Sequence, residues 1–302
     1  MAKIKAPLFS LGAHGSVADD ITLQDSFAGT IMRPKPRPKD TKTLKQIYQR
    51  WLYQDCAAWW HEQSPAQQQV YETAARRHHM TGFAWWMKEK LLFKFGLVFG
   101  AHLDERSGNI ATDFSANANH GTIHGCTHLP GIIDYALSFN GVDNWVDCGN
   151  DAAFNITKAI TICSHIYFTG QSAWHGTVLS KSYQSYELLH KWNTGYFSIA
   201  TAGGISSGQF TYPAFQLGKK FHVGVTYDGT NYKAYVDGNE IAIVWDAGPF
   251  TGDIAISANA VMLGRRPGSG NWMDGWLDET LLMGTAVSGG QMKRLSERKY
   301  PE

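Results

Sequence analysis

Apolar and polar positions alternate with a period of two through the last two thirds of the chain, and turn residues interrupt them at short intervals. The clearest stretch reads TYDGTNYKAYVDGNEIAI, in which Asp228-Gly229 precedes one alternating run and Asp237-Gly238 closes it. Tight hairpin turns require positive φ, which Gly and Asp tolerate. This region is therefore predicted to be antiparallel β structure.

Many short strands with turn signals at near-regular spacing predict a two-layer sandwich or jelly roll. A short helix is expected to close the chain over residues 288–300. The fold class is thus predicted as mainly β, with two antiparallel sheets. The predicted strands span residues 95–101, 121–123, 136–139, 145–147, 159–168, 176–182, 186–191, 196–200, 220–227, 232–236, 241–244, 261–263 and 275–283.

The first forty residues have an extended pattern that predicts an arm or a small hairpin, followed by the basic link RPKPRPK. Alternating prolines disfavour helix and sheet pairing and favour a polyproline II segment. Its cations Arg33, Lys35, Arg37 and Lys39 are predicted attachment residues that could contact phosphate or an acidic surface. A stiff spacer is the alternative reading.

From Thr41 apolar residues recur at three- and four-residue spacing, which predicts helices. Ser64-Pro65 is a natural N-cap and first helical residue, and Gly82 marks a second break. Three short helices are expected, forming a small α-helical N-terminal module. The predicted domains are an extended arm and link (1–40), a helical attachment module (41–94) and a β-sandwich (95–302).

Two tryptophan pairs lie in the predicted helices, at residues 59–60 and 85–86. Adjacent residues on a helix point in different directions. One member of each pair is therefore expected near the surface or against another subunit, since aromatic residues are enriched in interface cores. Trp59 and Trp85 are the predicted attachment residues of this kind.

Net charge is +1 overall, but residues 1–95 hold 14 Lys and Arg against 8 Asp and Glu, and the remainder holds 13 against 18. The basic first part suits an acidic partner, although ordinary solvated helix faces would look the same. No export signal and no transmembrane segment are expected. Cys163 is predicted to fill the core; Cys126 and Cys148 could pair, but reduced thiols are the preferred reading.

The large region resembles the concanavalin A-like, laminin-G-like lectin and glucanase superfamily over residues 96–302. The resemblance rests on ATDFSANANHGTI, ALSFNGVDNWVDCGN, FNITKAITICSHIYF, VLSKSYQSYEL, FHVGVTYDGTNYKAYVDGNEI and LGRRPGSGNWMDGWLDETLLM, which occur in the family's order. It implies a concanavalin A-like jelly-roll sandwich. It also implies a carbohydrate-binding module, an adhesion domain or, in some branches, a glycosidase.

The first third resembles the modules that begin some bacteriophage and prophage structural proteins. The residues concerned are IMRPKPRPKDTKTLKQIYQRW, AWWHEQSPAQQQVYETAA and MTGFAWWMKE. This resemblance implies a virion surface protein, such as a capsid decoration, a head fibre or a tail component. The expected partners are other virion proteins, further copies in a homo-oligomer and host glycans, with no membrane insertion and no nucleic acid.

A structural calcium ion is the one cofactor that the superfamily resemblance implies. It carries over Asp113 and Asn117, from the loop DFSANANHG, and Asp278, from the last long strand, as ligands. Calcium prefers six to eight hard oxygen ligands. The alternative is that these side chains only satisfy turn backbones. Ala116 and Ala118 depart from the glycines that the family usually has here.

A sugar-binding surface requires exposed aromatic rings, which stack on pyranose faces. The candidates are Trp174, Tyr183, Trp192, Trp245 and Trp272. Burial in the core or in an interface is the alternative for each of them.

No enzyme is predicted. The glucanase branch uses a Glu-x-Asp-x-x-Glu run that this sequence lacks, and Asp278 and Glu279 should point to opposite sides of a strand. The preferred function is a virion surface protein with a glycan-binding domain. The alternatives are a bacterial surface adhesion protein and, second, an atypical glycoside hydrolase.

Overall fold

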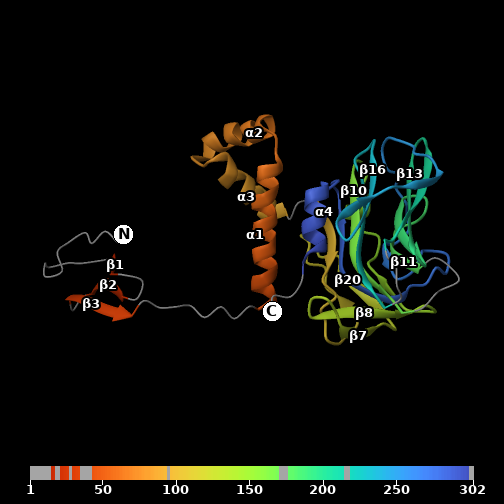
Figure 1. Cartoon of the computed structure of the whole chain (residues 1–302), viewed down its shortest axis with the longest axis horizontal. Helices are drawn as coiled ribbons and strands as arrows, with labels where there is room; N and C mark the ends of the chain where they lie inside the picture. Colours follow the sequence, from red (N-terminus) through yellow and green to blue (C-terminus); the bar gives the residue numbers. More distant parts are fainter. Residues whose placement is uncertain are drawn as a thin grey trace. The chain divides into compact units, whose positions relative to one another are not determined.

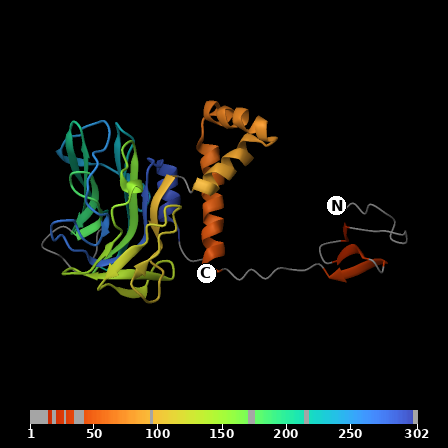
Figure 2. The ribbon, with the colours of Figure 1, turned by 180° about the vertical axis from the view of Figure 1, so that it is seen from behind.

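The computed structural model describes residues 15–17, 21–26, 29–34, 43–93, 96–169, 176–213 and 218–298, with side chains from Thr43 onward except at residues 92–93. The chain divides into two units, Met1–Leu44 and Lys45–Glu302. Figure 1 shows the elements coloured along the sequence, and Figure 2 shows them from behind.

The first unit contains one small antiparallel sheet in the order β1-β2-β3. Its strands are β1 (Gly15–Val17), β2 (Ile21–Ser26) and β3 (Gly29–Pro34). The paired β2 and β3 strands form the hairpin that was one of the two predictions for the arm. Arg33 belongs to strand β3, so the segment predicted to be polyproline II begins inside a strand. Lys35, Arg37 and Lys39 lie outside the described residues.

Three helices follow, α1 (Leu44–Glu62), α2 (Pro65–Ala75) and α3 (Gly82–Phe93), with the 3-10 turn η1 (Arg76–His78) after α2. Ser64 caps α2 as predicted. Its hydroxyl accepts a hydrogen bond from the Gln67 N–H at 3.3 Å, and Gln67 Oε1 accepts one from the Ser64 N–H at 2.9 Å. This capping box satisfies two backbone donors that the first turn would otherwise leave without partners.

An aromatic cluster holds the helices together. The ring of Trp60 lies 5.9 Å from Phe83 and 6.0 Å from Trp86. Trp59 is also buried, at 3% exposure. The expectation that one of these two tryptophans faces outward is therefore wrong. Trp59 lies one turn after Asp55, on a second face of α1 that is also covered, so its side chain packs inside the molecule and offers no attachment surface.

Trp85 is half-buried, as expected for one member of the second pair. The ring of His78 stacks on it with a centroid distance of 4.1 Å. Both residues line an open hollow of about 530 Å³ between α2 and α3.

Two antiparallel sheets form the sandwich, and the predicted fold class is confirmed. One sheet has the order β17-β16-β15-β10-β20-β8-β7, with β4 paired to β20. The other has the order β18-β14-β13-β12-β11-β19-β9-β6-β5. The strands of the first sheet are β4 (Leu97–Ala101), β7 (Thr127–Pro130), β8 (Tyr135–Asn140), β10 (Ile160–Phe168), β15 (Lys220–Tyr227), β16 (Tyr232–Val236), β17 (Asn239–Ile241) and β20 (Asp274–Met283). Those of the second are β5 (Ile110–Ala111), β6 (Gly121–His124), β9 (Trp145–Asp147), β11 (Gly176–Ser180), β12 (Tyr186–Lys191), β13 (Thr194–Thr201), β14 (Gly204–Thr211), β18 (Val244–Ala247) and β19 (Met262–Leu263).

The main core lies between the two sheets and is apolar. Phe99, Ile162, Leu188 and Phe197 belong to it and are at most 2% exposed. The 3-10 turn η3 (Ala152–Phe154) adds Phe154 to this core.

A second, smaller core lies on the outer face of the first sheet, where α4 (Gly289–Ser296) covers β10, β15 and β20 (Figures 1 and 2). Met292 and Leu295 of α4 pack there against Cys163, which is fully buried as predicted. Among the helices that the structure describes, none is long and apolar enough to cross a membrane.

Candidate functional site

Asp113, the first predicted calcium ligand, organises the loop after β5. Its carboxylate accepts hydrogen bonds from the N–H groups of Gly100 (3.0 Å), Ser115 (2.8 Å) and Asn119 (2.8 Å), and from the Ser115 hydroxyl (2.7 Å). The Asn117 side-chain amide donates to the Val98 carbonyl at 2.8 Å. These contacts stabilise the turn, which is the role given above as the alternative to calcium binding. Calcium binding at this loop stays a prediction.

Asp278, the third predicted ligand, is fully buried in β20. Its Oδ2 accepts hydrogen bonds from the N–H groups of Ile132 (2.7 Å) and Ile133 (3.3 Å). Gly131 allows this approach, because a Cβ at that position would lie 2.6 Å from Asp278 Oδ2. Asp278 Oδ1 is buried without a hydrogen-bond partner.

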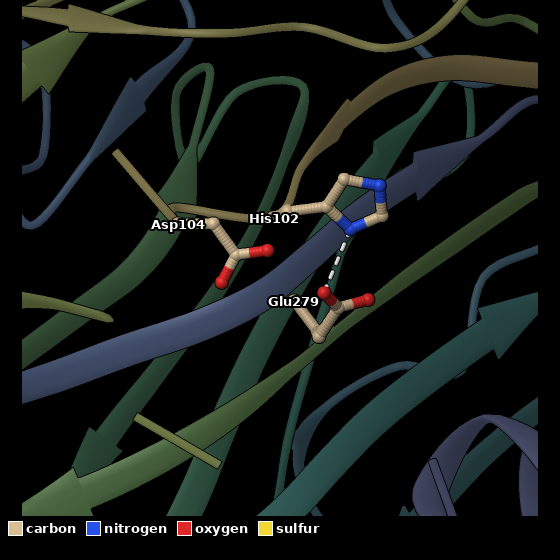
Figure 3. A group of neighbouring side chains, drawn as sticks. All are labelled: His102, Asp104 and Glu279. Atoms are coloured by element: carbon tan, nitrogen blue, oxygen red, sulfur yellow. Dashed lines mark hydrogen bonds and ion pairs between the residues drawn. The ribbon is translucent and has the colours of Figure 1, made fainter. Parts of the chain in front are cut away.

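Next to Asp278 lies a group that the sequence did not indicate: His102, Asp104 and Glu279 (Figure 3). We call these three residues the His–Asp–Glu cluster. One side-chain ligand atom from each lies within 4.8 Å of the others. His102 Nδ1 is 2.7 Å from Glu279 Oε1. His102 and Asp104 follow β4, whereas Glu279 lies 177 residues later in β20, which pairs with β4.

Local backbone geometry brings these side chains together. Glu279 has φ of 50°, and the pairing of β20 with β10 shifts register between Cys163 and His165. Asp278 and Glu279 are both buried, each at most 3% exposed. Burial alone does not decide the prediction that they point to opposite sides of the strand, because β20 is covered on both faces. Leu103, between His102 and Asp104, has φ of 61°.

Tyr48 of α1 covers the cluster. Its ring stacks on His102 with a centroid distance of 3.5 Å, and Phe114 stacks on His102 at 3.9 Å. The Tyr48 hydroxyl donates to Asp104 Oδ2 and lies 3.3 Å from Glu279 Oε1. Both faces of the imidazole are thus held by aromatic rings, which fixes its orientation.

The crowding of acidic groups changes their affinity for protons. Burial, followed by repulsion from Glu279, raises the pKa of Asp104 to about 7, although its hydrogen bond from Tyr48 opposes the rise. Burial and the charge of Glu279 raise the pKa of Asp278 to about 8. Burial acts to raise the pKa of Glu279 too, but the neighbouring His102 and Arg298 outweigh it and lower that pKa. Negative charge at the cluster therefore rests mainly on Glu279.

Two further residues of α1, Asp55 and Glu62, also contact the sandwich. With Tyr48 they recur every seven residues, which places all three on one face of the helix. We call these three residues the α1 stripe. Asp55 accepts a hydrogen bond from Arg298 Nη2 at 2.7 Å. Glu62 accepts one from Arg294 Nη2 at 2.6 Å and one from the Ser288 hydroxyl at 2.8 Å.

The predicted sugar-binding aromatics divide into separate groups. Trp245 is half-buried against the core, with its ring 5.7 Å from Phe197. Tyr183 precedes β12 and is 47% exposed, whereas Trp192 follows β12 and is 51% exposed. They therefore lie at opposite ends of that strand. Trp174 lies outside the described residues.

Trp272 belongs to the same end of the sheet as Trp192. His190 pairs with Gly176 across β12 and β11. The next residue, Thr177, donates hydrogen bonds from its N–H (3.0 Å) and hydroxyl (2.7 Å) to the carbonyl of Asn271. The half-buried Trp272 thus stands beside the start of β11, as Trp192 stands beyond the end of β12.

Arg265 completes this end of the sheet. Its guanidinium carbon lies 4.8 Å from the ring centre of Trp272 and 5.1 Å from that of Trp145, whose other neighbour is the stacked ring of His124 at 4.2 Å. No salt bridge joins Arg265 to a carboxylate within the described part of the chain. Its Nε is buried and has no hydrogen-bond partner. We call Trp192, Trp272 and Arg265 the tryptophan edge.

The neighbouring Arg266 has the opposite environment. Its Nε and Nη2 donate to the two oxygens of the fully buried Glu187 at 2.8 and 2.6 Å. A bidentate pair of this kind uses the charge of the guanidinium inside the protein. The charge of Arg266 is therefore already paired with a carboxylate, whereas the charge of Arg265 remains available to a ligand.

Three comparisons relate the chain to known proteins. The family model described as the concanavalin A-like lectin/glucanases superfamily matches residues 140–292, just over half of the chain. No curated protein matches the sequence. Among solved structures, the binding domain of Paraclostridial Mosquitocidal Protein 1 superposes with a TM-score of 0.54 at 13% identity, covering 68% of this chain and 52% of that one.

Two further structures have the same general likeness. A mutant of HCR/D gives a TM-score of 0.52 at 11% identity, covering 68% of this chain and 53% of that one. Trypanosoma rangeli sialidase in complex with sialic acid gives 0.49 at 17% identity, covering 67% of this chain and 32% of that one. The chain thus spans about half or less of the length of these proteins. The two superpositions with TM-scores above 0.5 are at 13% and 11% identity, so they concern the fold alone.

Proposed function

The chain belongs to the concanavalin A-like lectin/glucanases superfamily, and from that premise we propose that it binds glycans through the tryptophan edge. The fold alone does not fix a ligand, so the proposal depends on the residues of the site. Glycan recognition uses aromatic faces for the sugar ring and polar groups for the hydroxyls. The tryptophan edge combines two indole rings with a guanidinium.

The observation that carries the proposal is that Arg265 has no carboxylate partner among the described residues. Its guanidinium lies between the indole rings of Trp272 and Trp145, and a guanidinium is a strong donor of several N–H groups in a fixed plane. Within the described residues no carboxylate neutralises it, in contrast to Arg266 beside it. Donors of this kind suit sugar hydroxyls and carboxylates, and the adjacent Trp272 supplies apolar contact for a ring.

The setting that we propose is the surface of a virion. The first unit, with its small sheet and the following basic stretch, is distinct from the unit that contains the sandwich. This division suits a protein whose N-terminal part attaches to capsid or tail proteins while its sandwich meets host glycans. Several copies on one particle would convert weak single-site binding into avidity.

A glycan array with the full chain tests the proposal. The Trp272→Ala variant is expected to lose binding about tenfold or more, because truncating a packed aromatic anchor of a binding site typically costs about 2 kcal/mol or more. Tyr183→Ala is the control, since Tyr183 is an exposed aromatic at the other end of β12. Silence of the wild-type protein across the array, or equal losses in both variants, would remove the tryptophan edge as the site.

The virion setting has its own test, which is whether the protein co-purifies with intact virus particles at a fixed copy number. Deletion of the first 40 residues is expected to abolish co-purification and leave glycan binding intact. Glycan binding by a protein that never associates with particles would instead favour a bacterial surface adhesion protein.

A further inference from the structure

We propose that the His–Asp–Glu cluster binds one divalent metal ion, and that its donor set suits zinc. The ligands would be Nδ1 of His102 and one carboxylate oxygen each from Asp104 and Glu279 (Figure 3). This site is separate from the tryptophan edge and from the predicted calcium ligands Asp113 and Asn117. Three protein ligands leave one position of a tetrahedral zinc ion for water or the Tyr48 hydroxyl.

The three donor atoms are already close enough to share an ion. They lie within 4.8 Å of one another, and His102 Nδ1 is 2.7 Å from Glu279 Oε1. Two ligand atoms on one tetrahedral zinc ion are roughly 3.3 Å apart, given bond lengths of about 2.0–2.1 Å. Small changes in side-chain torsions would bring the donors to that spacing without movement of β4 or β20.

A buried oxygen without a hydrogen-bond partner provides independent support. Glu279 is 3% exposed, yet its Oε2 accepts no hydrogen bond, and its ion pair with Arg298 Nη1 is long, at 3.9 Å. Arg298 is also used by Asp55, at 2.7 Å. Orphaned buried acceptors are uncommon in native proteins and call for a compensating charge, which a divalent ion would supply.

The imidazole is oriented in advance for coordination. Tyr48 and Phe114 stack on its two faces, so the ring has little freedom to turn its Nδ1 away from Glu279. The Tyr48 hydroxyl is hydrogen-bonded to Asp104 and lies 3.3 Å from Glu279. Groups that hold the ligands of a metal in this way typically contribute 10–100-fold to affinity.

The donor set favours zinc over calcium. Calcium takes six to eight oxygens, whereas imidazole together with carboxylates is a zinc-type combination.

Binding would also tighten the contact between α1 and the sandwich. All three ligands belong to the sandwich, but Tyr48 of α1 contacts each of them. A bound ion would fix the two carboxylates that Tyr48 contacts.

Calorimetric titration of the metal-stripped full chain with zinc, near neutral pH, tests the proposal. We expect one equivalent to bind and the melting temperature to rise. His102→Gln should weaken affinity at least about tenfold. His102 is partly exposed, so this variant is expected to fold, which circular dichroism verifies. His61→Gln is the control, because His61 is an exposed histidine of α1.

Cobalt provides a second readout, since the intensity of its visible absorption reports coordination number. A four-coordinate spectrum that is lost in His102→Gln supports the site. Absence of saturable zinc binding would overturn the proposal. So would equal affinity in wild type and His102→Gln, or saturation by calcium but not by zinc.

Discussion

The interior of the sandwich and the contact between α1 and the sandwich are built from different interactions. The interior is a continuous apolar core in which aromatic and branched side chains are almost completely buried. The α1 contact instead depends on the α1 stripe and its arginine, serine and carboxylate partners. Apolar packing depends little on pH or salt, whereas charged contacts depend on both. The position of α1 should therefore be easier to perturb than the sandwich itself.

The largest difference between the two regions is expected when a cavity is made in the core of the sandwich. Phe99→Ala is expected to cost about 3–5 kcal/mol, because Phe99 is fully buried between the sheets. Chemical denaturation measures this loss, which should appear in the unfolding of the whole sandwich. A cost below about 1 kcal/mol would show that the interior can collapse around the missing ring.

Arg298 is shared by Asp55 and Glu279, and removing it should weaken the α1 contact at a smaller cost in stability than the core cavity. Arg298→Met leaves the buried carboxylate of Asp55 without its 2.7 Å partner, which should cost about 1–3 kcal/mol. Hydrogen exchange should show faster exchange in α1 and little change in the strands. The control is Lys158→Met, because the pair of Lys158 with Asp253 is exposed and should contribute less than about 1 kcal/mol. Equal losses in the two variants would contradict the comparison.

A pair of buried histidines makes the sandwich sensitive to acid. His165 and His222 face each other across β10 and β15 with a ring distance of 4.7 Å, and burial lowers the pKa of both. Arg298, Lys220 and Asp237 line the same hollow. In the unfolded chain the two histidines bind protons below the ordinary histidine pKa of 6.5, whereas in the folded protein they stay neutral to lower pH. The free energy of unfolding therefore falls as the pH drops below 6.5.

Replacing one of the two histidines tests this sign. Unfolding of His222→Phe should depend less on pH than unfolding of the wild type between neutrality and about pH 5. A wild-type stability that rises over this interval would mean that the histidines are stabilised in their charged form.

Local signals in the sequence predicted much of the fold. Ser64 with Gln67, and Asp237-Gly238 between β16 and β17, act within four residues, so short-range chemistry determines them. Strand β14 was missed because GISSGQFT lacks an apolar alternation. Pairing with β13 and β18 makes it a strand, and that information lies in its neighbours.

The sites were harder to predict. Trp192 and Trp272 were recognised as aromatic candidates, but only the sheet shows that they share one end and that Tyr183 does not. The His–Asp–Glu cluster was missed because Glu279 lies 177 positions after His102 and the backbone departs from regular strand geometry at Leu103 and Glu279. A His-x-Asp spacing at the end of a strand was the one local signal available.

The most direct test of glycan binding at the tryptophan edge is a titration of the best array glycan into wild type, Trp272→Ala and Tyr183→Ala, with the melting temperature recorded for each. Affinity should fall about tenfold or more in Trp272→Ala and stay near that of the wild type in Tyr183→Ala, with a cooperative melting transition kept in both variants. Full affinity in Trp272→Ala would place the ligand elsewhere on the molecule and contradict the account.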